Sequence, residues 1–152
     1  MRAALVTVAA GWLYGLAFPP AAKWGTAWVA IAPLIVVSRL HGARAAAAFG
    51  ALYAVVGTCA TVDWLPHTIA VYYAQPVALG LALFAAVTLV MVVPPVAAFA
   101  ATVSLTAAAP AALRVLVAGA AWTASELWRA HALGGNPWML VGYSQAHVGA
   151  IA

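Results

Sequence analysis

The chain has 152 residues, of which 68% are hydrophobic and only 5% are charged, with six Lys and Arg against two Asp and Glu. An ordinary soluble domain is roughly 45–50% apolar and about 25% charged. The composition therefore excludes a soluble globular domain and a disordered chain, and a single cysteine excludes a disulfide scaffold. We predict an all-α integral membrane protein, a polytopic bundle of about five transmembrane helices, because each span needs roughly 20 residues.

Five apolar runs follow one another along the chain, and each predicts a membrane-spanning helix. The predicted spans are residues 3–18, 24–38, 45–62, 76–103 and 111–130. The first two are shorter than a bilayer core of about 30 Å, so Trp24 and Trp28 are expected to anchor the second at the interface. Within the fourth, Pro94-Pro95 predicts a kink or the end of regular helix. The first 22 residues have an alternative interpretation as a signal peptide, which their bulky aromatic residues disfavour.

The placement of basic residues predicts the orientation in the membrane. With a cytoplasmic N-terminus, Lys23 and Arg129 face outward and the other four basic residues face the cytoplasm, which the positive-inside rule favours. The cytoplasmic residues are Arg2, Arg39, Arg44 and Arg114. The connections at residues 63–75 and 134–145 then face outward.

One stripe of polar residues stands out near the end of the fifth span. Trp122, Glu126 and Arg129 follow one another at spacings of four and three, which places them on one helix face. A charged residue within a span is a functional candidate by default. The stripe could form a polar spot in a groove that holds a lipid headgroup or orients the adjoining loop. The alternative, which the spacing alone slightly favours, is a structural ion pair near the interface, with Arg129 reaching toward water.

The other polar residues give weaker signals. Asp63 and His67 stand four residues apart, but two ligands do not make a zinc site, so we expect Asp63 to cap the next helical turn and His67 to lie at the interface. Cys59 lies in an apolar stretch, where a thiol is usually inert packing. We predict no metal site, no cofactor and no nucleic-acid partner.

The segment at residues 134–145 cannot continue the fifth helix. It opens with two glycines and contains Pro137, Trp138 and Tyr143. Irregular backbone at membrane depth must be buried in protein or line a wet cavity. We therefore predict a re-entrant loop and include these three residues, with Trp122, Glu126 and Arg129, among the candidates that line a lipid or substrate groove.

The same region resembles the apolipoprotein N-acyltransferase family. That family has a Glu-X-X-Arg helix end followed by Gly-Phe-Pro-Trp and Leu-Gly-Tyr-Ser-Gln. The corresponding residues here are Ser125-Glu126-Leu127-Trp128-Arg129, Gly135-Asn136-Pro137-Trp138 and Gly142-Tyr143-Ser144-Gln145. The opening Gly15-Leu16-Ala17-Phe18-Pro19-Pro20 and the later Trp64-Leu65 and Tyr72-Tyr73 are also similar. Asn136 departs from the usual Phe of the family.

The resemblance implies a multi-pass protein of the bacterial inner membrane. Members transfer an acyl chain from a phospholipid to the α-amino group of the diacylglyceryl-cysteine at a lipoprotein N-terminus. The implied partners are therefore the phospholipid donor, the diacylated lipoprotein and the bilayer. The reaction runs through a thioester on Cys, with a Glu base and a Lys that stabilises the oxyanion, all in a nitrilase-like domain that follows the spans.

The chain ends at Ala152, before any such domain, and Cys59 lies in the wrong segment to be that nucleophile. Residues 1–152 are therefore expected to be an N-terminal transmembrane domain that holds no catalytic residue and is inactive alone. Two alternatives stay open. A related membrane domain anchors a polyprenol-phosphate mannosyltransferase in some actinobacterial systems, and a small transporter is a third possibility.

Overall fold

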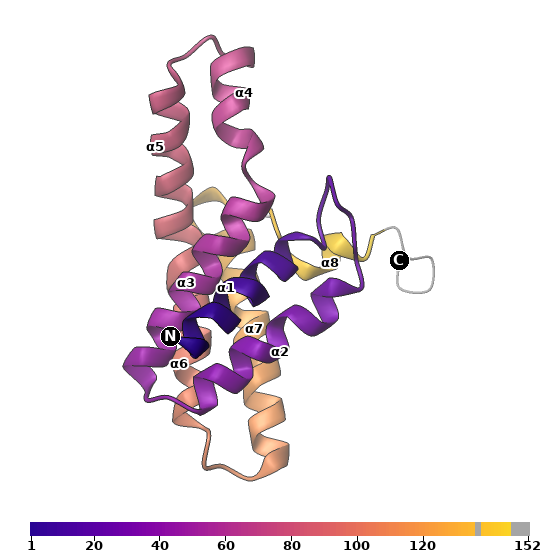
Figure 1. The fold of residues 1–152 in the computed structure, drawn as a ribbon, viewed down its shortest axis with the longest axis vertical. Coiled ribbons are helices and arrows are strands. Elements are labelled where there is room, and N and C mark those ends of the chain that lie inside the picture. The colour runs from indigo at the N-terminus through magenta and orange to yellow at the C-terminus, as the bar shows by residue number, and fades with distance from the viewer. Residues whose placement is uncertain (136–137, 147–152) are drawn as a thin grey trace.

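A computed structural model of the chain describes residues 1–135 and 138–146, and this part is helical without any strand. Figure 1 shows helices packed together, with a helical hairpin that projects beyond the others at one end. The α-helices are α1 (Arg2–Gly15), α2 (Thr26–Arg39), α3 (Ala43–Thr61), α4 (Trp64–Tyr72), α5 (Val77–Val87), α6 (Val93–Leu105), α7 (Ala111–His131) and α8 (Val141–Ser144). A π-helical turn, η1 (Thr88–Val92), joins α5 to α6, and a 3₁₀ turn, η2 (Ala132–Gly134), follows α7. The all-helical class is confirmed, and a helix lies at each of the five predicted positions.

Small residues let the central helices approach closely. A Cβ added at Gly50 of α3 would lie 2.7 Å from the carbonyl oxygen of Val96 in α6. A Cβ added at Gly15 of α1 would collide with the Cβ of Ala60 in α3. Glycine at a helix interface allows the backbones themselves to touch, which is how helices gain packing energy without a hydrophobic driving force. The core therefore forms where α1 and α6 pack on α3.

The fourth predicted span is one continuous helical stretch with a change of pitch. It runs from Val77 to Leu105, and the π-turn at Thr88–Val92 comes directly before Pro94 and Pro95. Proline has no backbone N–H and its ring crowds the preceding turn, so regular α-helical hydrogen bonding cannot pass through the pair. The π-turn takes up that irregularity, and the chain continues as α6.

Residues 63–75 are mostly helical, whereas the sequence indicated only a connection between two spans, and that this segment faces outward stays a prediction. Helix α4 occupies most of this segment and forms a hairpin with α5 that projects from the bundle (Figure 1). Gly80 permits the contact, since an added Cβ there would lie 2.7 Å from the Cα of Pro66. Asp63 stands at the N-cap of α4 without a side-chain capping bond, so the predicted cap is wrong.

Two helices in the described part are long and apolar enough to cross a membrane, namely α3 and the stretch from Val77 to Leu105. Helix α2 is apolar but shorter. Helix α1, at 14 residues, would extend only about 21 Å at a rise of 1.5 Å per residue. The spanning role of α1, α2 and α7, and the total of about five spans, stay predictions.

The bundle has two distinct ends. Helix α2 ends, α3 begins, α6 ends and α7 begins at one of them (Figure 1). Arg39, Arg44 and Arg114 belong to these helix termini. The other end is formed where α7 finishes and the chain turns through η2 into α8. The predicted site residues belong to this second end.

Candidate functional site

The stripe on α7 forms a hydrogen-bonded group at the end of the helix. Glu126 Oε1 accepts hydrogen bonds from the indole Nε1 of Trp122 at 3.0 Å and from Nη2 of Arg129 at 3.5 Å. Arg129 is only 1% exposed, whereas Glu126 keeps 21% exposure. The guanidinium carbon also lies 6.0 Å from the centre of the Trp122 ring. The contacts of Glu126 with Trp122 and Arg129 are therefore those that the helical spacing predicted. The ion pair is largely buried.

The ion pair holds the segment that follows Trp138. Glu126 Oε1 accepts a third hydrogen bond, from the backbone N–H of Val141 at 3.0 Å. Arg129 Nη1 donates to the carbonyl oxygen of Met139 at 3.3 Å. Met139 is buried with φ at +64°, a backbone conformation that a non-glycine residue rarely adopts. These fixed contacts stabilise an otherwise unfavourable turn at Met139.

Tyr14 of α1 completes this group from the opposite end of the sequence. Its hydroxyl donates to the same carbonyl of Met139 at 2.5 Å, and its ring centre lies 6.0 Å from that of Trp122. The sequence patterns did not single out Tyr14 as a site residue. A weak signal existed, because a tyrosine in an apolar helix needs a hydrogen-bond partner. We call Tyr14, Trp122, Glu126, Arg129 and the backbone of 139–141 the polar cluster.

Gln145 ties the same segment to the start of α2. Its Oε1 accepts a hydrogen bond from the indole Nε1 of Trp28 at 3.2 Å, and its Nε2 donates to the carbonyl of Trp24 at 3.3 Å. Nε2 also donates to Ser144 Oγ at 2.7 Å. Gln145 is buried, so its amide is satisfied by protein groups. Trp28 thus has a specific partner in addition to its predicted place at an interface.

Two other predicted groove residues, Trp138 and Tyr143, lie on either side of the backbone of 139–141. The Trp138 ring packs edge-on against Trp64, with ring centres 4.9 Å apart, and is 37% exposed. Tyr143 is exposed on α8. Pro137 lies outside the described residues. The re-entrant path of residues 134–145 stays a prediction.

An apolar cavity lies beside this end of α7. It has a volume of about 390 Å³ and is bounded by one face of α6 and one face of α7. Its lining residues are Pro94, Pro95, Ala98, Phe99, Thr102, Ala121, Ala124, Ser125 and Trp128. Such a surface suits hydrocarbon, and Ser125 and Trp128 flank Glu126 in sequence.

The residues of the polar cluster are suited to holding a molecule or a loop in place. It brings together one carboxylate, one guanidinium, a phenol and backbone groups, and it includes neither Cys59 nor Lys23. Cys59 is exposed on α3. Among the described residues no group of three or more His, Cys, Asp and Glu could hold a metal ion. These residues can orient a bound molecule or a loop by hydrogen bonds and charge.

Two buried tyrosines provide a test of the bond to Met139. Tyr14 and Tyr53 are both 2% exposed, but the Tyr53 hydroxyl has no hydrogen-bond partner in the described part of the chain. We expect Tyr14→Phe to lower the free energy of unfolding by about 1–2 kcal/mol, because the Met139 carbonyl loses a buried donor. Tyr53→Phe should be neutral or stabilising, since it removes an unpaired hydroxyl. Melting temperatures in detergent measure both, and equal losses would contradict a specific role of the Tyr14 bond.

Comparison with known protein families matches residues 10–152 to a family that is described as the apolipoprotein N-acyltransferase N-terminal domain. No curated protein matches the chain. The family match covers the helices that supply the polar cluster, including Tyr14 on α1, Trp28 on α2 and Glu126 on α7. The chain therefore belongs to the apolipoprotein N-acyltransferase N-terminal domain family, an acyltransferase lineage, as its motifs predicted.

Proposed function

We propose that this chain is the membrane part of an apolipoprotein N-acyltransferase. Such an enzyme transfers an acyl chain from a phospholipid to the diacylglyceryl-cysteine of a bacterial lipoprotein. The family match over residues 10–152 carries this proposal. It is supported by the fixation of segment 139–145 to three helices, through Tyr14, Glu126 with Arg129, and Trp28.

The polar cluster has a positioning role in this proposal. Glu126 and Arg129 fix the backbone at Met139 and Val141, which sets the position of the neighbouring Trp138 and Tyr143. Together with Pro137 and Trp122, these residues line the groove through which lipidic substrates reach a catalytic centre. The apolar cavity of about 390 Å³ between α6 and α7 suits an acyl chain beside that groove.

Acyl transfer is expected to need a nucleophile and oxyanion-stabilising donors that this chain does not bring together in one site. The reaction requires an activated nucleophile and donors that stabilise an oxyanion. The sequence has one Cys and one Lys, of which Cys59 lies on α3 and Lys23 lies before α2. Neither belongs to the polar cluster, so the chain is expected to bind and orient substrate without turnover.

The proposed setting is the bacterial inner membrane, with about five spans and a cytoplasmic N-terminus. Arg39, Arg44 and Arg114 lie at helix termini of the end opposite the polar cluster, which supports this orientation under the positive-inside rule. The polar cluster and segment 134–145 then face outward, toward the side where lipoproteins are modified.

Photolabelling tests the proposed function. The purified chain, reconstituted in phospholipid, is exposed to a short lipopeptide that carries an N-terminal diacylglyceryl-cysteine and a photoreactive group. We expect labelling of segment 138–145, competition by unlabelled lipopeptide, and no competition by the same peptide without lipid. No N-acylated product should form, because the nucleophile is not assembled.

Three outcomes would contradict the proposal. Competition by polyprenol phosphate instead of lipopeptide would favour a mannosyltransferase anchor. Labelling spread evenly over the helices would show that segment 138–145 does not form a specific substrate groove. N-acylated product that disappears in Cys59→Ser would show that the chain carries its own catalytic thiol.

A further inference from the structure

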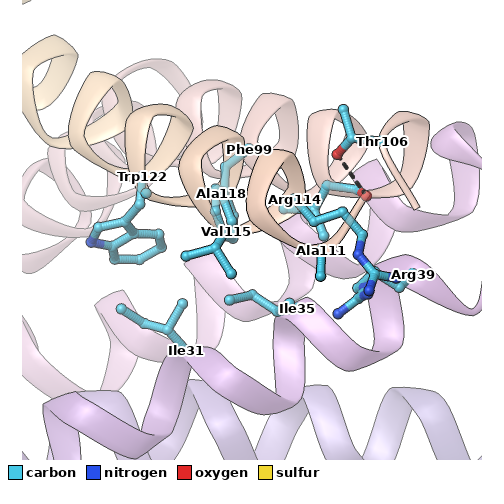
Figure 2. A pocket seen from close by; sticks show the side chains of 12 residues that line it. Ile31, Ile35, Arg39, Phe99, Thr106, Ala111, Arg114, Val115, Ala118 and Trp122 are labelled. Atoms are coloured by element: carbon cyan, nitrogen blue, oxygen red, sulfur yellow. Dashed lines mark hydrogen bonds between the residues drawn. The ribbon is translucent and has the colours of Figure 1, made fainter. Parts of the chain in front are cut away.

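A second cavity is lined by three helices and extends from Trp122 toward the opposite end of the bundle. It has a volume of about 410 Å³. Its walls are mainly apolar, with Ile31 and Ile35 on α2 facing Val115 on α7 (Figure 2). Helix α6 contacts both α2 and α7 and forms the floor between them. We call this cavity the α2–α7 slot.

The two ends of the slot differ in charge. Trp122 closes one end, and Arg39 and Arg114 stand together at the other (Figure 2). The fold brings these arginines together from the last residue of α2 and the first turns of α7. Both arginines also line an adjoining cavity of about 350 Å³, so they lie where the two cavities meet.

The arginine pair has no acidic partner in the described part of the chain, where the only ion pair is Arg129 with Glu126. The sequence offers just two acidic side chains, and the other, Asp63, lies at the start of α4. Arg114 Nη1 donates to a backbone carbonyl at 3.4 Å, and its buried Nε has no partner among the described residues. Two neighbouring like charges repel each other, so this end of the slot attracts an anion.

An apolar slot with a cationic mouth matches one class of ligand. We propose that the α2–α7 slot binds an anionic phospholipid, with its phosphate against Arg39 and Arg114 and one acyl chain running past Ile35 and Val115 toward Trp122. Guanidinium groups recognise phosphate through paired hydrogen bonds. A zwitterionic headgroup would bring an additional cation to a site that already holds two, so a net negative lipid is favoured.

The cationic mouth of the slot is distant from the polar cluster, although Trp122, at the far end of the slot, belongs to both. Twelve residues separate Arg114 from Glu126 along α7, which corresponds to about 18 Å of helix. The bound lipid therefore belongs to the leaflet at the end that carries Arg39, Arg44 and Arg114. It fills the space between α2 and α7 as a structural component, and the inference holds whatever reaction the family domain serves.

Native mass spectrometry of the purified 152-residue chain tests the proposal. The protein is exchanged into detergent with equal amounts of phosphatidylglycerol and phosphatidylcholine that have the same acyl chains. We expect about fivefold greater retention of phosphatidylglycerol. Arg39→Gln and Arg114→Gln should each lower that retention about fivefold. Arg44→Gln is the matched control, because Arg44 is an exposed arginine at the same end that does not line the slot, and it should leave retention unchanged.

Two further measurements distinguish a lipid site from a site for free anions. Val115→Trp fills the slot without changing charge and should abolish selective retention. Arg114→Lys keeps the charge but loses the paired hydrogen bonds, so it should keep only part of the retention. Millimolar inorganic phosphate should not displace the lipid, and displacement would show a free-anion site instead. Retention that falls equally in Arg44→Gln, or that survives Arg39→Gln and Arg114→Gln in folded protein, would overturn the proposal.

Discussion

Glu126→Gln is expected to lower the free energy of unfolding by about 3 kcal/mol, because it leaves the Arg129 guanidinium buried without a counter-charge. The Arg129 side chain is 1% exposed and so has almost no access to water, whereas Glu126 is 21% exposed. Arg129→Gln should therefore cost less, since the remaining carboxylate keeps water and the N–H donors of Trp122 and Val141. The double variant should recover part of the loss from Glu126→Gln, because the unpaired charge is gone.

A double-mutant cycle in detergent, scored by melting temperature, measures this coupling. Arg44→Gln is the matched control, since it removes an exposed arginine and should change stability by less than about 0.5 kcal/mol. The same variants in the photolabelling assay separate two roles. If Glu126 only positions segment 139–145, the double variant should recover labelling along with stability, whereas direct contact with substrate would leave labelling low. Additive losses in melting temperature would refute the pairing.

Gly50→Ala is expected to destabilise the protein by about 1–3 kcal/mol, the usual cost of overpacking a tight interior. The new methyl group would lie 2.7 Å from the carbonyl oxygen of Val96 and 2.9 Å from the Cα of Ala97. Both atoms are backbone, so no rotamer change can relieve the contact and α3 must move away from α6. Because α3 and α6 form the centre of the core, the loss should extend to the whole bundle.

Gly119→Ala is the matched control for that change. Gly119 is also inside a helix, but an added Cβ there would meet no atom within 4 Å. Alanine is favoured over glycine in a helix by about 1 kcal/mol, so this variant should be neutral or more stable. Thermal unfolding of both variants in one detergent makes the comparison, and equal effects would show that helix propensity, not close packing, governs Gly50.

The sequence by itself determined the class of the protein and the positions of its main helices. Eight charged residues cannot cover the surface of a soluble domain. Long apolar runs that end at proline or glycine indicate helices, because the ends of a helix depend on the residues found there. Spacing also placed Trp122, Glu126 and Arg129 on one face of α7, since a helix repeats every 3.6 residues. The motif around Glu126 identified the family.

Only the tertiary structure decided what those side chains contact. Tyr14 meets Met139 across 125 positions of sequence, and Trp28 meets Gln145 across 117. Local periodicity gives the direction of a side chain on its own helix but says nothing about which distant backbone carbonyl lies opposite. The meeting of Arg39 with Arg114 at the mouth of the α2–α7 slot is of the same kind, because it depends on how α2 and α7 pack on α6. Long-range packing, which no short window of sequence contains, therefore determines both the polar cluster and the α2–α7 slot.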